Sequence, residues 1–185
     1  VSPLILAVLA FFILKEKISR NQITGIVVAT IGIFLLVSKG NLTNFSWLQS
    51  TGDWLVLCSA HTWALYAVAT RYVTQRCNPL AVTVGVLTPS AILILFYVSF
   101  TSDWTKFLHL PLEPMLALIF LGVFALGLAH WFWQAGMAKM GAARAGIFLY
   151  LEPLATTALA VPYLNEEFGL IGAVGGFLVL AGVFV

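Results

Sequence analysis

The sequence predicts an all-α membrane protein, a polytopic bundle of transmembrane helices with inverted-topology five-helix repeats. Three observations predict this class. The chain of 185 residues is 61% hydrophobic and 9% charged, with a mean hydropathy of +1.02, whereas soluble proteins are about 25% charged. The few charges are separated by long apolar runs. Finally, two parts of the chain match each other at a fixed shift along the sequence, as internal repeats do.

The charge-free runs define the expected helices. A transmembrane helix needs about 20 apolar residues, within a range of about 17–25, whereas the strands of membrane barrels are about 10 residues long. Runs of helical length are 21–38, 54–70, 77–102, 114–138 and 168–185, together with 145–165, which contains one acid. Residues 1–14 are charge-free but short, and we interpret them as the second half of a helix. Seven helical segments are therefore expected.

The positions of Lys and Arg predict the orientation of these helices. If the 15–20 loop is cytoplasmic and the helices alternate in direction, most basic residues fall on the cytoplasmic side: Lys15, Lys17, Arg20, Arg71, Arg76, Lys139 and Arg144. Lys39 and Lys106 then lie outside. We expect an integral, multi-pass protein in the plasma (inner) membrane of a prokaryote.

An internal repeat appears when residues 3–35 are aligned with 153–185, without a gap. The shared residues include Pro3/Pro153, Glu16/Glu166, Gly25/Gly175 and Gly32/Gly182. Five crossings separate equivalent positions, and because this number is odd the copies run in opposite directions. Inverted repeats are typical of secondary transporters, which bind substrate at the repeat interface. We expect residues 1–38 to end a first repeat, 39–52 to form an exterior linker and 53–185 to form the second repeat.

Two blocks of motifs occur in the second copy. They contain Gly52-Asp53, Trp63-Ala64-x-Tyr66 and Arg71, and then Gly141-Ala142-Ala143-Arg144-Ala145, Leu151-Glu152-Pro153 and Asn165-Glu166-Glu167. With these motifs the chain resembles the EamA domain of the drug/metabolite transporter superfamily. The resemblance implies a ten-helix permease with cytoplasmic termini, of which about seven helices are present, that carries amino acids, other small metabolites, sugars or drugs. Glu167 departs from the pattern, since family members often have a basic residue there.

Glu152 is the first candidate for a substrate-binding or coupling residue. It follows Arg144 by eight residues, about 12 Å along a helix, and an acidic residue at that depth is a functional candidate by default. Pro153 removes a backbone donor, which can open the helix toward a cavity. A carboxylate there suits proton coupling or the binding of a cationic amine. The structural alternative is that Glu152 satisfies backbone groups near the proline or caps a neighbouring helix.

Helical spacing adds further candidates for substrate binding or coupling. They are Trp63, Tyr66, Ser59, His130, Gln134 and Thr156. The residues of the 54–70 segment form one polar and aromatic stripe, with His61 on the opposite side. Those of the 114–138 segment form a second stripe, whose histidine would suit a proton-linked carrier. The structural alternative is that these polar groups only form hydrogen bonds between helices, which contribute less than about 2 kcal/mol.

Small residues predict close helix packing. Gly172 and Gly176 form a GxxxG motif, and Gly25 forms a small-xxx-small pair with Ala29, and both motifs allow helix backbones to approach each other. Since glycines recur in both copies, the same packing seam is expected twice.

We interpret the chain as a secondary transporter that moves small metabolites, such as amino acids or drugs, by alternating access. A membrane-embedded enzyme and a receptor or scaffold are the alternatives, although no HExxH or GxSxG motif supports an enzyme. The expected partners are a small-molecule substrate, with proton coupling, and the lipid bilayer, and a homodimer stays open. Scattered basic residues argue against nucleic acid. No metal or cofactor is expected, and Cys58 and Cys77 are expected to be free thiols.

Overall fold

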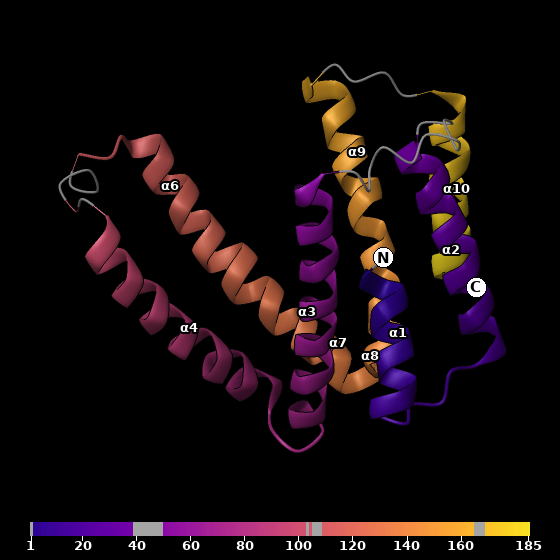
Figure 1. Ribbon diagram of the computed structural model, residues 1–185, viewed down its shortest axis with the longest axis horizontal. Helices are drawn as coiled ribbons and strands as arrows, with labels where there is room; N and C mark the ends of the chain where they lie inside the picture. Colours follow the sequence, from indigo (N-terminus) through magenta and orange to yellow (C-terminus); the bar gives the residue numbers. More distant parts are fainter. Residues whose placement is uncertain (1, 39–49, 103, 105–108, 165–168) are drawn as a thin grey trace. The chain divides into compact units, whose positions relative to one another are not determined.

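The computed structural model describes residues 2–38, 50–102, 104, 109–164 and 169–185 (Figure 1). All regular structure in these ranges is helical, which confirms the predicted all-α class. Contacts within the chain divide it into two units, of which unit 1 comprises Val1–Ala69 and Met140–Val185 and unit 2 comprises Thr70–Lys139.

Unit 1 combines the helices at the two ends of the sequence. They are α1 (Ser2–Ile13), α2 (Arg20–Ser38), most of α3 (Thr51–Thr74), α8 (Ala142–Ile147), the 3₁₀ turn η3 (Phe148–Tyr150), α9 (Leu151–Leu164) and α10 (Leu170–Phe184). Helix α8, the turn η3 and α9 follow one another without a break, so they act as one long helical segment.

Unit 2 contains α4 (Pro79–Thr101), α6 (Leu112–Phe120), the π-helix η2 (Leu121–Leu128) and nearly all of α7 (Ala129–Met140). Within this unit Arg71 donates a hydrogen bond of 3.3 Å from Nη1 to the carbonyl of Ala138, close to the end of α7. Basic groups stabilise the carbonyls at helix C-termini in this way.

Each predicted apolar run is a helix. Pro79–Thr101, Leu112–Met140 and Ala142–Tyr163 are long and apolar enough to cross a membrane, and the shorter Ser2–Ile13, Arg20–Leu36 and Leu170–Phe184 are also apolar. The third expected span begins earlier than the charge pattern indicated, at Thr51 instead of residue 54. Its start is fixed by a capping box, because Ser50 Oγ accepts from the amide of Asp53 at 3.1 Å while Asp53 Oδ2 accepts from the amide of Ser50 at 3.0 Å.

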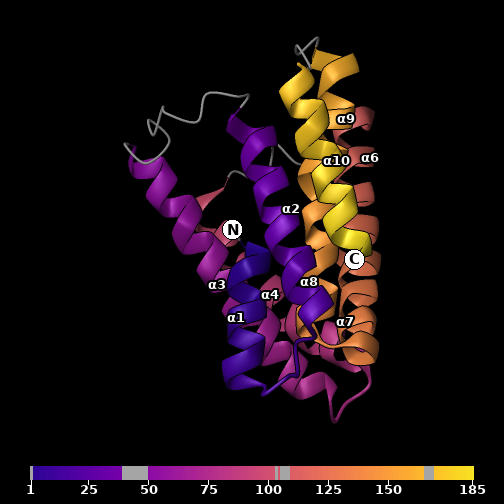
Figure 2. The ribbon, with the colours of Figure 1, turned by 90° about the vertical axis from the view of Figure 1, so that its right-hand side faces the viewer.

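Helices α2 and α10 form the closest contact in unit 1, and they lie side by side in both views (Figures 1 and 2). Gly25 faces Gly182, and Gly32 faces Gly175, so the two helices run antiparallel. A methyl group added to Gly32 would lie 2.7 Å from the carbonyl oxygen of Gly175, and one added to Gly175 would lie 2.7 Å from that of Gly32. The backbones therefore touch along a glycine seam, defined by these four residues.

The expectation of one seam in each copy is wrong in its arrangement. The glycines that match at the shift of 150 meet in a single seam, because Gly25 and Gly32 of α2 lie against Gly182 and Gly175 of α10. Gly25 contacts Gly182, the counterpart of Gly32, and Gly32 contacts Gly175, the counterpart of Gly25. Ala29 joins this seam, with its backbone nitrogen 2.6 Å from a methyl group added to Gly182. Gly176, from the predicted GxxxG, faces the side chain of Leu154 instead.

Glu16 connects the loop after α1 to the start of α8. Its Oε1 accepts a hydrogen bond from the amide of Ala142, and its Oε2 accepts one from the amide of Ala143, both at 3.0 Å. These amides have no partner within their own helix, and the carboxylate also complements the positive end of the helix dipole. Gly141 precedes them with φ +89°, and a methyl group there would lie 3.0 Å from both carboxylate oxygens.

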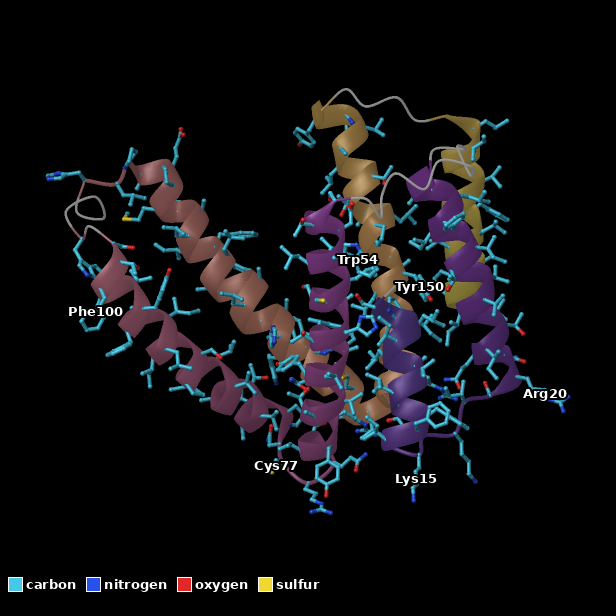
Figure 3. The ribbon with its side chains drawn as sticks, in the orientation of Figure 1. Lys15, Arg20, Trp54, Cys77, Phe100 and Tyr150 are labelled. Atoms are coloured by element: carbon cyan, nitrogen blue, oxygen red, sulfur yellow. The ribbon has the colours of Figure 1, made fainter. Side chains whose placement is uncertain are left out.

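This contact relates the direction of α8 to that of α1. Lys15 and Arg20 lie at the end of unit 1 where α1 ends and α2 begins (Figure 3). Glu16 brings the start of α8 to the same end, so the segment α8–η3–α9 runs opposite to α1. Grouping these basic residues at one end fits the orientation expected from the sequence. Lys39 and Lys106, expected on the other side, lie outside the described residues, as do Glu166 and Glu167.

The glycine seam predicts the effect of adding one methyl group. We expect Gly32→Ala to lower the free energy of unfolding by about 1–3 kcal/mol, because the new Cβ meets backbone atoms that cannot rotate away. Gly136→Ala is the matched control, since nothing lies within 4 Å of a methyl group there and alanine favours helix. Thermal unfolding of both variants in detergent would check this. Equal stability of Gly32→Ala and the unchanged protein would contradict the close contact.

The Glu16 contact predicts a second stability difference. We expect Glu16→Ala to lower the free energy of unfolding by about 1–3 kcal/mol, because two buried amides at the start of α8 lose their acceptor. Lys17→Ala is the control from the same loop, since Lys17 is exposed, and it should change stability by less than about 0.5 kcal/mol. Chemical unfolding in detergent measures both. If the two variants were equally stable, the capping role would be wrong.

Candidate functional site

A cavity of about 340 Å³ lies within unit 1. Its walls come from the start of α1, from α2, from the first half of α3 and from the junction of α8 and α9. The lining residues are Ser2, Pro3, Ile33, Val56, Ser59, Ala60, Trp63, Leu149, Tyr150, Glu152 and Pro153.

The junction of α8 and α9 supplies the acidic wall. Pro153 cannot donate a backbone hydrogen bond, and the helix before it tightens into the 3₁₀ turn η3, where the amide of Leu151 donates to the carbonyl of Phe148. Such a turn inside a long helix commonly marks a functional site or local strain. Leu149, Tyr150 and Glu152 all reach the cavity from this short stretch.

Tyr150 is fixed as a wall of the cavity by a hydrogen bond to α2. It is 3% exposed, and its hydroxyl lies 2.7 Å from Thr30 Oγ1. Thr30 donates its own hydroxyl proton to the carbonyl of Ile26 at 2.7 Å, so Tyr150 is the donor in the contact with Thr30. Figure 3 shows Tyr150 between the α8–α9 segment and α2. The phenol therefore holds the acidic segment against the helix of the glycine seam.

The predicted stripe on α3 reaches the cavity in part. Ser59 and Trp63 line it, together with Val56 and Ala60, at the spacing of one helix face. Tyr66, one turn further, is half-buried and is not part of the lining. His61, expected on the opposite side, is exposed, and its Nδ1 lies 2.8 Å from the carbonyl of Leu57.

The other predicted residues are not among those that line the cavity within unit 1. Thr156 donates its hydroxyl to the carbonyl of Glu152 at 2.9 Å, within the same helix. His130 and Gln134 lie on α7 in unit 2, where His130 is half-buried and Gln134 is fully buried. The structure therefore groups Ser59, Trp63 and Glu152 and leaves the remaining four outside the lining.

Residues that lie 150 positions apart in the sequence both line the cavity. Ser2 and Pro3 from α1 line one part, and Glu152 and Pro153 from α9 line another, and the shift of 150 relates the two pairs. Ser2 and Pro3 are not among the predicted site residues, although the proline shared by positions 3 and 153 is a signal that could have identified them. Tyr150 was not predicted either, because its place in the cavity wall depends on a hydrogen bond to Thr30, which lies 120 positions away in the sequence.

The lining mixes polar and apolar groups. It combines one carboxylate, two serine hydroxyls, one indole, one phenol and six apolar residues, and small-molecule sites commonly have this mixture of apolar walls and a few polar groups. Among the residues that the structure describes, no three His, Cys, Asp or Glu side chains come together as metal ligands would.

Comparison with known proteins agrees with this architecture. The chain matches the EamA-like transporter family over residues 50–185. It is 31% identical to the uncharacterized transporter YyaM of Bacillus subtilis (strain 168), over 98% of this chain and 60% of that protein. It is 24% identical to a probable terminal-alkyne amino-acid exporter of Streptantibioticus cattleyicolor, over 100% of this chain and 60% of that protein.

A solved crystal structure supports the fold. It is similar with a TM-score of 0.74 at 20% identity, covering 98% of this chain and 63% of the other. The chain spans about 60% of the length of the curated relatives it matches. With the family match over most of its residues and its apolar helices, the chain is an integral membrane protein that belongs to the EamA-like transporter family.

Proposed function

We propose that this chain forms part of a secondary transporter that moves small metabolites, such as amino acids or drugs, by alternating access. The observation that carries this proposal is the cavity of unit 1, whose walls include two pairs of residues 150 positions apart, Ser2 with Glu152 and Pro3 with Pro153, and thereby one carboxylate. Transporters built from inverted repeats bind their substrates at the interface between the copies. The names of the relatives as transporters point to the same general activity and to a protein that is not an enzyme.

The proposed repeat architecture pairs α1–α2 with α9–α10. Residues 1–38 would end the first repeat, 39–52 would form the linker and 53–185 the second repeat. Two features support the pairing. Helices α1 and α9 run in opposite directions, and the contacts of the glycine seam are reciprocal, as they are in an interface with two-fold symmetry.

Glu152 is proposed as the residue that couples transport to protons or contacts the substrate directly. It is the acidic residue of the cavity lining, it precedes a proline, and it belongs to a segment that is long and apolar enough to cross a membrane. Ser59 and Trp63 are proposed as its partners in substrate binding. Tyr66, His130, Gln134 and Thr156 keep their predicted role as further candidates for binding or coupling, since the complete protein contains more helices than unit 1.

Location in the plasma membrane of a prokaryote is also a proposal. The charge distribution favours a cytoplasmic position for the ends of α1 and α8. Relatives occur in bacteria, in archaea and in the plant Arabidopsis thaliana, so the comparisons do not select one kind of organism. A receptor or scaffold without transport activity is the second candidate function, and flux measurements separate the two.

Replacing the acidic residue tests the proposal. In the complete protein, reconstituted in liposomes with a pH gradient and a metabolite panel, we expect Glu152→Gln to lower the transport rate at least tenfold and to remove its dependence on the gradient. Glu113→Gln is the control, because Glu113 is an exposed acid at the start of α6, and it should transport normally. Both variants must elute from a size-exclusion column as folded protein. If Glu152→Gln kept its rate and pH dependence, the coupling role would be wrong, and if no solute moved at all, the receptor alternative would gain support.

A further inference from the structure

The charge of the cavity limits which solutes it can bind. Among the described residues that line it, Glu152 is the one acid, and none is Lys, Arg or His. A solute that brings one positive charge would pair with this carboxylate. A solute that brings a carboxylate of its own would place a like charge near Glu152, with no cationic side chain in the lining to offset it, and like charges close together repel each other.

The uncharged lining residues indicate the size and polarity of the rest of the solute. Ile33, Val56 and Leu149 are apolar, and Trp63 offers an indole face, which attracts both flat rings and cations. Tyr150 does not compete as a hydrogen-bond donor, because its proton is directed to Thr30. The volume of about 340 Å³ is near the lower end of the range of about 300–1,000 Å³ for ligand pockets. These walls fit a small body with one ring or a short apolar chain.

The two serine hydroxyls lie in the same lining, and one of them has a special position. Ser2 lies 150 positions before Glu152, directly ahead of the aligned segments, and both residues precede a proline that lines the cavity. The equivalent positions therefore offer one charged and one neutral group to the same space. The negative charge of the cavity comes from Glu152 alone among the described lining residues. Position 2, which now holds a serine, can accommodate a polar side chain.

We propose that the cavity binds a small monovalent organic cation, an amine or ammonium compound with an apolar or aromatic body, in preference to the zwitterionic amino acid of the same skeleton. The proposal rests on the assignment of this cavity as the substrate site, and it narrows the substrate class. It assigns the charge selection to Glu152 and the contact with the apolar body to Trp63. It also predicts that moving the carboxylate from position 152 to position 2 leaves the preferred class of solute unchanged.

A matched pair of ligands tests this selectivity directly. Phenethylamine and phenylalanine share one skeleton and differ by a carboxylate, and their binding to the purified complete protein in nanodiscs can be measured by calorimetry. We expect phenethylamine to bind at least tenfold more tightly than phenylalanine. Equal binding, tighter binding of phenylalanine, or binding of neither would overturn the proposal. Because this comparison uses the unchanged protein, it does not depend on the folding of a variant.

Two variants then assign the selectivity to the cavity. We expect Glu152→Ser to weaken phenethylamine binding at least tenfold, and the double variant Ser2→Glu/Glu152→Ser to regain at least half of the lost affinity on a logarithmic scale. Glu113→Gln, outside the cavity, is the control. Retained binding by Glu152→Ser would place the selection elsewhere and overturn the assignment. If the double variant bound no better than Glu152→Ser, the equivalence of the two positions would be wrong.

Transport of the same two compounds separates this inference from the proposed function. Liposomes that contain the complete protein are loaded with labelled phenethylamine or phenylalanine, and efflux is followed. Efflux of phenylalanine in preference to phenethylamine would overturn the substrate class while the transporter function remained. Selective binding of phenethylamine without efflux of either compound would preserve the inference and count against the transporter function. Selective binding together with efflux of the amine supports both.

Discussion

Contact between the backbones of α2 and α10 is the interaction on which the rest of unit 1 depends. Four glycines remove the side chains that would keep the two helices apart, so carbonyl and amide groups of one helix reach the other. Inside a lipid bilayer the hydrophobic effect does not drive helices together. Close van der Waals packing has to stabilise their association instead. The seam joins the end of one proposed repeat to the end of the other. It thereby fixes α2 as the support against which the cavity is built.

The cavity depends on this support through two polar contacts. Tyr150 reaches from the 3₁₀ turn to Thr30 on α2, and Glu16 holds the start of α8, which leads directly into that turn. Hydrogen bonds within a low-dielectric region are costly to break, so the segment that carries Glu152 is held at both positions. This arrangement holds the acidic Glu152 beside the apolar walls of the cavity, as the proposed selection of solutes by charge requires.

Much of the fold could be predicted from the sequence, because apolar runs of membrane length have few alternatives to a helix. The boundaries of the helices depend on local chemistry. Because of the capping box of Ser50 and Asp53, α3 begins at Thr51 and not at residue 54 as the charge pattern indicated. The candidate site was predictable where the signal is local, as for Glu152 before its proline and for Ser59 and Trp63 on one helix face. Tyr150 and the role of Glu16 were not, because their partners lie 120 and 126 positions away and leave no trace in spacing.

Disulfide formation across the seam tests the central claim most directly. Ala29 and Val179 are both fully buried and pack in one cluster with Tyr150, whereas Val27 and Phe177 lie on exposed faces of the same helices. In a complete protein whose other cysteines are replaced by serine, the pair Ala29→Cys/Val179→Cys should cross-link rapidly in native membranes under mild oxidation, and the pair Val27→Cys/Phe177→Cys should not. Cleavage at a protease site inserted between α4 and α6 shows on a gel whether the two fragments stay linked. Linkage of the first pair alone is the predicted result, and linkage of the second pair alone would contradict the seam.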